Sequence, residues 1–173
     1  MAEGRLRALV VGSGWGRHHA YAYQAHPQVD LVGLCVRHES ERSLHLAQEL
    51  QVPLFTDLGQ ALRETQPDVV SCATKEAQHE EVSVAALEAG AHVYCEKLLA
   101  HRLDSARRIV EAARRTGRRL MVGYNYRFSP SALKLREWVE TGRLGELAFA
   151  TALTFGYCLH HTLDLICSLM GEV

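Results

Sequence analysis

The chain has 173 residues, which is room for one complete domain and part of a second. Its 19 basic and 20 acidic residues are well mixed and give a formal net charge of −1, so nothing draws the surface to nucleic acid or to an anionic membrane. Hydrophobic residues make up 47% and supply a core, but no apolar run approaches the roughly 18 residues of a membrane span. The expected partner is a small molecule.

The cysteines indicate a reducing compartment. There are five of them, with no C-x-x-C pair, and Cys35, Cys72 and Cys95 lie in apolar runs where buried free thiols are expected. The first apolar run is broken by Gly12 too early to be the core of a signal peptide. We therefore expect a cytoplasmic protein. No set of histidines, cysteines or carboxylates has ligand spacing, so no metal site is predicted.

Short apolar runs alternate with helical patterns over the first two thirds of the chain, which is typical of βαβ units and a parallel sheet. The expected strands are Ala8–Val11, Val29–Val36, Val69–Ala73, His92–Cys95 and Leu120–Val122. Apolar helix faces precede Gly90 and Gly117, where helices are expected to end. The predicted fold class is α/β, with a doubly wound parallel sheet over residues 1–122.

From residue 123 the pattern changes. Ser129 and Pro130 are typical of a helix start, and that helix is expected to stop at Gly142. The alternation over Glu146–Tyr157 predicts a long strand with two uncharged faces, followed by a helix over Thr162–Met170. Residues 123–173 are thus expected to form part of an α+β second domain. The strand's open face or edge predicts a homo-oligomer, most simply a two-fold dimer, unless the last helix folds back over it.

The stretch "VVGSGWGRHH" contains a candidate dinucleotide-binding turn, because its glycines follow a predicted strand and precede a predicted helix. Gly12 permits the tight turn, and Gly14 lets the backbone approach a pyrophosphate held by the helix N-terminus. Trp15 follows in the same turn. The third glycine comes one residue early, as Gly16 with Arg17 behind it, and we expect Gly16 to serve close packing of helix on strand.

A glycine turn that holds no ligand is the alternative for this stretch. His18 and His19 follow the turn, in the first turn of the expected helix. Both are expected to be solvated.

The end of the second strand usually distinguishes the two nicotinamide cofactors, because an acidic residue there bonds the ribose hydroxyls and repels a 2′-phosphate. Here Val36 holds that position and Arg37 follows it. This favours NADP(H), with Arg37 binding the 2′-phosphate, and leaves NAD possible. A surface arginine without a ligand is the alternative.

Three stretches together resemble the Gfo/Idh/MocA oxidoreductases: "PDVVSCATKEAQHEEVSVAALEAGAHVYCEKLLA", "GRRLMVGYNYRFSPSALKLREWVETGRLGEL" and "HTLDLICSLMGEV". The resemblance is specific from Arg5 to about Leu147. It implies an NAD(P)-binding Rossmann domain followed by a substrate domain, of which this chain carries only the first part. It also implies oxidation or reduction of carbonyl, hydroxyl or imine groups, mostly on sugars and cyclitols.

The resemblance assigns Glu96 to the cofactor crevice and places Lys97 beside the nicotinamide and the substrate. A lysine at the end of a buried parallel strand is expected at the ligand crevice of the sheet, where partial desolvation favours acid/base use. A salt bridge between Glu96 and Lys97 is the alternative. Leu98 stands where the family has proline, so a trans peptide bond is expected there.

Further residues match the family's motifs in part. Thr74 and His79 match its T-P-x-x-x-H stretch without the proline and are implied to line the cofactor crevice. His161 and Asp164 match its H-x-x-D pair, which makes His161 a candidate general acid, unless the two simply bond each other. Tyr157 replaces the motif's first aspartate and is a candidate proton donor, with packing as the alternative.

The sequence therefore predicts an NADP(H)-dependent oxidoreductase that acts on a small, sugar-like substrate. The alternative from another class is a non-catalytic nucleotide-binding or regulatory module that lacks most of the substrate domain. A lyase or isomerase that uses transient oxidation is a third possibility within the family.

Overall fold

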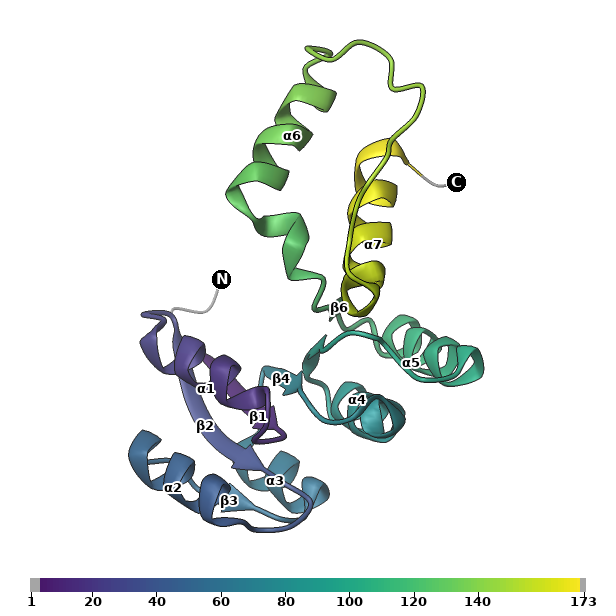
Figure 1. Ribbon diagram of the computed structural model, residues 1–173. Helices are drawn as coiled ribbons and strands as arrows, with labels where there is room; N and C mark the ends of the chain where they lie inside the picture. Colours follow the sequence, from purple (N-terminus) through teal and green to yellow (C-terminus); the bar gives the residue numbers. More distant parts are fainter. Residues whose placement is uncertain (1–3, 172–173) are drawn as a thin grey trace. The chain divides into compact units, whose positions relative to one another are not determined.

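The computed structural model describes residues 4–171. The chain divides into two compact units, with the boundary between Gly123 and Tyr124. The first unit holds a sheet flanked by helices α1 to α5, and the second holds helices α6 and α7 (Figure 1).

The sheet of the first unit has six strands in the order β3-β2-β1-β4-β5-β6, and every neighbouring pair is parallel. The strands are β1 (Leu6–Val11), β2 (Val29–Cys35), β3 (Leu54–Phe55), β4 (Val69–Cys72), β5 (His92–Cys95) and β6 (Leu120–Val122). They are almost wholly apolar because both faces of the sheet are covered. The predicted doubly wound α/β fold is confirmed. Only β3 was missed, since two residues are too few to form a pattern.

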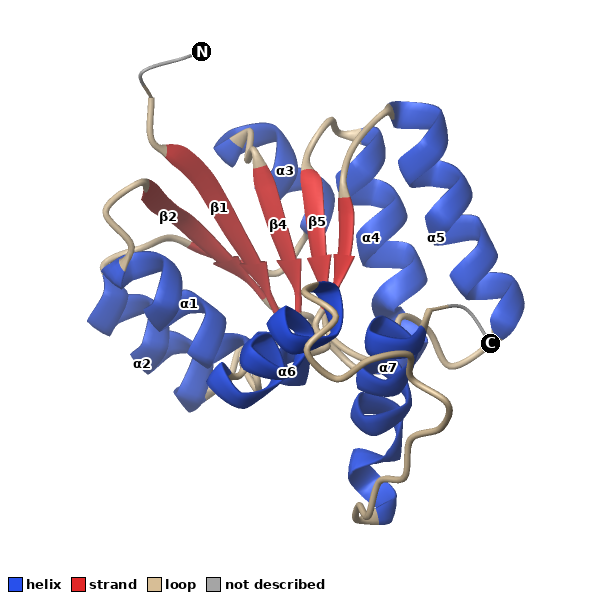
Figure 2. Ribbon diagram, turned by 90° about the horizontal axis from the view of Figure 1, so that it is seen from above, coloured by secondary structure: helices blue, strands red, loops and turns tan. Residues whose placement is uncertain are grey.

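Helices cover the sheet in two layers, as right-handed crossovers require when the strand order reverses. One layer contains α1 (Gly16–Ala25) and α2 (Glu41–Leu50), and the other contains α3 (Leu58–Thr65), α4 (His79–Glu88) and α5 (Leu103–Thr116). Figure 2 shows α1 with α2 on one side of the strands and α4 with α5 on the other. Each layer has its own core, centred on Val10 and Leu34 for the first and on Leu9 and Val70 for the second.

The second unit consists of α6 (Pro130–Glu140) and α7 (Leu159–Met170), with the short 3-10 helices η2 (Asn125–Phe128) and η3 (Gly156–Cys158). The side chain of Ser129 caps α6 by accepting a hydrogen bond from the Ala132 amide at 3.3 Å, and Pro130 is the first helical residue. The predicted start of this helix is therefore confirmed.

The strand expected over Glu146–Tyr157 is wrong. Residues 146–155 form no regular element, and Phe149 and Phe155 are 83% and 73% exposed. Alternation alone does not make a strand, because its backbone groups need a neighbouring strand to bond to. The second unit has no other strand in the part of the chain that the structure describes.

All five cysteines are free, and Cys35, Cys72 and Cys95 are buried as predicted. Among residues 4–171, no helix has both the length and the apolar character needed to cross a bilayer.

Candidate cofactor site

A cavity of about 680 Å³ opens at the carboxyl ends of the strands in the first unit. Its wall contains the glycine turn after β1, the segments after β2 and β3, and the segment after β4. β1 lies between β2 and β4 in the sheet, so the cavity sits where the strand order reverses. Open parallel sheets bind their ligands at this point.

Each of the three glycines in the turn suits its position for a different geometric reason. Gly12 has φ +103°, and a side chain there would collide with the carbonyl of Ala73. Gly14 lines the cavity, and no protein atom lies within 4 Å of the position a Cβ would take, so its surface is open to a ligand. A Cβ on Gly16 would lie 3.0 Å from Val10 Cγ1, which shows that this glycine lets α1 pack tightly on β1.

The start of α1 lies at the cavity, since Gly14 and Trp15 are in its wall and the helix begins at Gly16. Trp15 makes no side-chain bond to the helix, and the first turn contains no acidic residue. The first amides of a helix have no partner within it and carry partial positive charge. The geometry therefore suits an anionic group such as a pyrophosphate.

The end of β2 contributes Val36, Arg37 and His38 to the wall. Arg37 is exposed, and no hydrogen bond or ion pair holds it among residues 4–171. One carboxylate near it is Asp57, whose Oδ1 accepts a hydrogen bond from the Gln60 amide at 2.5 Å and so caps α3. The cation at the end of β2 is therefore available to a ligand in the cavity.

His19 lies in a buried network instead of solvent, which corrects the expectation from sequence. Its Nε2 lies 3.0 Å from Oε1 of Glu96, and its Nδ1 lies 2.6 Å from Oγ of Ser71. A carboxylate only accepts, so Nε2 donates to Glu96, while the Nδ1 contact with the Ser71 hydroxyl completes the network. The network joins α1 to β4 and to the residue that follows β5. His18, by contrast, is exposed.

A signal for this contact exists in the sequence. Gly16 and Ala20 are the buried residues of α1, and His19 lies three residues after Gly16, on the same face of the helix. That face packs on the sheet, so a polar residue there needs a buried partner.

Glu96 is held in its charged form by this network. Burial raises the pKa of its carboxyl, but the hydrogen bond and charge of His19, helped by the Lys97 amide, outweigh burial and bring the pKa below its usual range. The Lys97 amide donates to Glu96 Oε2 at 3.3 Å. Glu96 therefore lies at the base of the turn that carries Lys97.

The Lys97 side chain is half-buried and does not line the 680 Å³ cavity. It makes no salt bridge to Glu96 within the described residues, where the carboxylate is paired with His19 instead. The expected trans bond after it is wrong, because the Lys97–Leu98 peptide is cis. The Leu98 carbonyl lies 2.8 Å from His79 Nδ1. Leu98, at the position of the family's proline, is therefore in contact with a residue distant in the chain.

The two residues of the T-P-x-x-x-H stretch have different positions. Thr74 lines the cavity, whereas His79 is fully buried behind the wall and has both ring nitrogens against backbone carbonyls. The structure thus brings Gly12, Gly14, Trp15, Arg37 and Thr74 together around one cavity. Gly16, His79 and Glu96 do not line it.

The remaining candidates belong to the second unit. His161 is buried and stacks on Tyr126 with ring centroids 4.2 Å apart. Asp164 bonds Arg127 through both carboxylate oxygens at 2.5 Å, so its partner is this guanidinium. Tyr157 is 77% exposed and stacks on Phe155, which does not match a buried packing role.

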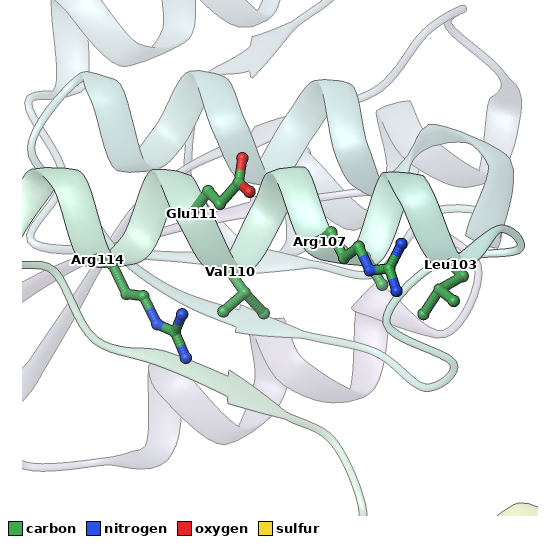
Figure 3. A pocket seen from close by; sticks show the side chains of 6 residues that line it. Leu103, Arg107, Val110, Glu111 and Arg114 are labelled. Atoms are coloured by element: carbon green, nitrogen blue, oxygen red, sulfur yellow. The ribbon is translucent and has the colours of Figure 1, made fainter.

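A second hollow, of about 320 Å³, runs along α5 (Figure 3). It is lined by Leu103, Ala106, Arg107, Val110, Glu111 and Arg114. All six come from one helix, and within residues 4–171 no residue of another element lines it. This hollow lacks the features of a ligand site.

Comparison with known proteins places the chain in a family. Residues 6–124 match the model of an oxidoreductase family with an NAD-binding Rossmann fold, Gfo/Idh/MocA. The D-glucoside 3-dehydrogenase of Escherichia coli K12 is 32% identical over 160 residues, which are 91% of this chain and 46% of that one. An inositol 2-dehydrogenase of Corynebacterium glutamicum is 32% identical over 151 residues, which are 86% and 45% of the two chains.

A solved structure, the WlbA dehydrogenase from Bordetella pertussis in complex with NADH and UDP-GlcNAcA, has 26% identity and a TM-score of 0.77 over 84% of this chain and 42% of its own. The chain spans less than half the length of these relatives. The family match covers more than half of this chain and agrees with the sheet order and the glycine turn. The chain belongs to the Gfo/Idh/MocA oxidoreductase family.

Proposed function

We propose that the cavity after β1, β2 and β4 binds NADP(H), and that the chain supports hydride transfer to or from a carbonyl, hydroxyl or imine carbon of a small, sugar-like substrate. The observation that carries the cofactor part is the open surface of Gly14 beside the start of α1. A strand, a turn of glycines and a helix N-terminus at the switch point of a parallel sheet provide the contacts that a pyrophosphate needs.

The preference for NADP(H) rests on the end of β2. Val36 and Arg37 stand where an acidic residue would bond the ribose hydroxyls of NAD(H), and Arg37 is in the cavity wall. A guanidinium forms charge-assisted, bidentate bonds with a phosphate, whereas a ribose hydroxyl gives it much less.

The substrate class rests on the relatives, whose names include a glucoside and an inositol dehydrogenase. When bound, the cofactor supplies the hydride acceptor or donor at its nicotinamide ring. In this proposal the proton of the substrate oxygen or nitrogen is moved by Lys97 or, as alternatives, by His161 or Tyr157. Glu96 fixes the backbone that carries Lys97, through its bond from the Lys97 amide.

Fluorescence titration of the reduced cofactors tests the cofactor preference. NADPH is expected to bind more tightly than NADH, and Arg37→Ala to remove most of the difference, about 1–3 kcal/mol or roughly 5- to 150-fold. Arg63→Ala is the matched control, because Arg63 is a basic residue on α3 that does not line the cavity. Equal affinities for the two cofactors in the unmutated protein would contradict the assignment.

We propose in addition that the protein forms a homo-oligomer, most simply a dimer, in a reducing cytoplasm. The exposed side chains of Phe149, Leu153 and Phe155 and the free state of all five cysteines support this. Light scattering coupled to size exclusion measures the mass, and Leu153→Lys is expected to dissociate the assembly. A monomeric mass at micromolar concentration would rule the oligomer out.

A further inference from the structure

Two cysteines and a histidine meet behind the wall of the cofactor cavity. Cys72 ends β4, Cys95 ends β5, and the pairing of these parallel strands sets them opposite each other. His79 is the first residue of α4, the crossover helix between the two strands. One ligand atom from each of the three residues lies within 4.8 Å of the others, and all three side chains are fully buried.

These distances are close to those of a tetrahedral metal site. Zinc bonds of about 2.3 Å to sulfur and about 2.0 Å to nitrogen place the ligand atoms roughly 3.4–3.8 Å apart. The cluster is wider than this by at most about 1.0–1.4 Å, so metal binding requires a small rotation of these side chains. Thr74 Oγ1 lies 3.7 Å from Cys72 Sγ, which is the spacing expected of a fourth, oxygen ligand.

Both ring nitrogens of His79 face backbone carbonyls, and a neutral ring can donate to only one of them. Nδ1 lies 2.8 Å from the Leu98 carbonyl and Nε2 lies 3.2 Å from the Thr74 carbonyl. A neutral imidazole has a single N–H, so it donates to one of these carbonyls and turns a lone pair toward the other. With the proton on Nδ1, which makes the shorter contact, Nε2 is the nitrogen with the lone pair. A carbonyl that accepts from the far nitrogen is the usual support of a ligating histidine.

The charge of such a site suits its surroundings. Cys72 and Cys95 belong to the apolar core under α3, α4 and α5. Two thiolates and a neutral imidazole balance the charge of a divalent cation, so the filled site carries no net charge into that core. Three carboxylates in the same place would leave an excess of negative charge.

We propose that Cys72, His79 and Cys95 bind a thiophilic divalent cation of the zinc type, with Thr74 as the fourth ligand, which fastens the start of α4 to β4 and β5. Ala73 and Gln78 lie next to ligands in the chain and line the cofactor cavity, as does Thr74 itself, so the ion reaches the site from that side. The role is structural, because the four ligand positions are filled by the protein. The proposal is independent of the cofactor and of turnover.

Spectroscopic titration of the reduced, metal-free protein with Co²⁺ is the first test. One equivalent is expected to give the visible bands of tetrahedral cobalt together with a thiolate-to-metal charge-transfer band, and Zn²⁺ is expected to displace it. Octahedral or weak spectra in the unmutated protein would overturn the proposal without any variant.

Variants locate the site. Cys72→Ser and Cys95→Ser are each expected to weaken Co²⁺ binding at least tenfold and to lose the charge-transfer intensity of one sulfur, and His79→Gln to weaken it similarly. Cys35→Ser and Cys158→Ser are matched controls, one a buried thiol and one a thiol of the second unit, and both should keep the spectrum. Loss of the spectrum in Cys158→Ser, or its survival in the Cys72→Ser Cys95→Ser double variant, would place the metal elsewhere.

Melting temperatures measured with and without Zn²⁺ distinguish a variant that has lost the metal site from one that fails to fold. Zn²⁺ in excess is expected to raise the melting temperature of the unmutated protein and of both controls by several degrees, because the ion binds the folded chain. The same addition should raise the melting temperature of folded Cys95→Ser clearly less. An equal rise in Cys95→Ser would overturn the assignment.

Discussion

His19, in the first turn of α1, donates a hydrogen bond across 3.0 Å to Glu96, the residue that follows β5. Both side chains are about nine-tenths buried, at 12% and 10% exposed. The pair therefore connects the helix that begins at the glycine turn with the segment that carries Lys97. Its loss would affect stability and site geometry together.

Removal of His19 is expected to destabilise the fold strongly. His19→Leu leaves the Glu96 carboxylate and the Ser71 hydroxyl buried without their partner, which typically costs about 3–5 kcal/mol. Urea denaturation measures the free energy of unfolding. His18→Leu is the control, since His18 is exposed and its replacement should change stability by less than about 0.5 kcal/mol. Similar losses in the two variants would refute a specific role for His19.

Glu96 makes stability depend on acid pH. Its pKa is lowered in the folded protein, so the unfolded chain binds a proton more readily. Its contribution is therefore fully present above the unfolded carboxyl pKa of about 4.3 and is lost as pH falls through the lower, folded value. Unfolding free energies from pH 7 down to pH 3 should fall more steeply in the unmutated protein than in Glu96→Gln.

Glu80 contributes in the same acid range, because hydrogen bonds from Arg108 and Ser105 lower its pKa to about 2. The Glu80 side chain is 31% exposed, so its contribution to the pH dependence of stability is expected to be largely screened in concentrated salt, whereas that of the more deeply buried Glu96 should persist. Identical pH profiles for Glu96→Gln and the unmutated protein at high salt would show that the carboxyl is not held in its charged form.

The glycines of the turn are expected to separate cofactor binding from folding. Gly14→Val should weaken NADPH binding at least tenfold and leave the melting temperature nearly unchanged, because its Cβ meets only open space. Gly16→Val is expected mainly to lower the melting temperature, because its Cβ would lie only 3.0 Å from Val10 Cγ1. If Gly14→Val binds NADPH normally, the cofactor does not pass over this turn.

Lys97 is expected to matter for turnover and little for folding. Lys97→Met keeps the length of a half-buried side chain and removes its charge, and it should lower turnover by 10²–10⁴-fold, the range of general acid–base catalysis. The rate of cofactor reduction over a panel of sugars and inositols measures this. Lys134→Met, on α6, is the control. A Lys97→Met protein with more than about a tenth of the original rate would show that Lys97 is not the proton carrier.

Local pattern determined the strands β1, β2, β4, β5 and β6, the N-cap of α6 and the glycine turn. In each case a short stretch carries its own physical demand. Buried parallel strands need continuous apolar runs, Ser129 and Pro130 meet the needs of a helix start, and Gly12 adopts a φ of +103° that other residues avoid. These features can be predicted from the sequence without knowing which other segments contact them.

The contacts between segments distant in the chain follow from the tertiary structure alone. His19 meets Glu96 across 77 positions of the chain, and Cys72 meets Cys95 because β4 pairs with β5. The spacing of those residues shows neither contact, since chain distance says nothing about which strands are neighbours. The same reason explains the strand that did not form over residues 146–155: its alternation is a local property, but a strand exists only where another backbone offers the hydrogen bonds.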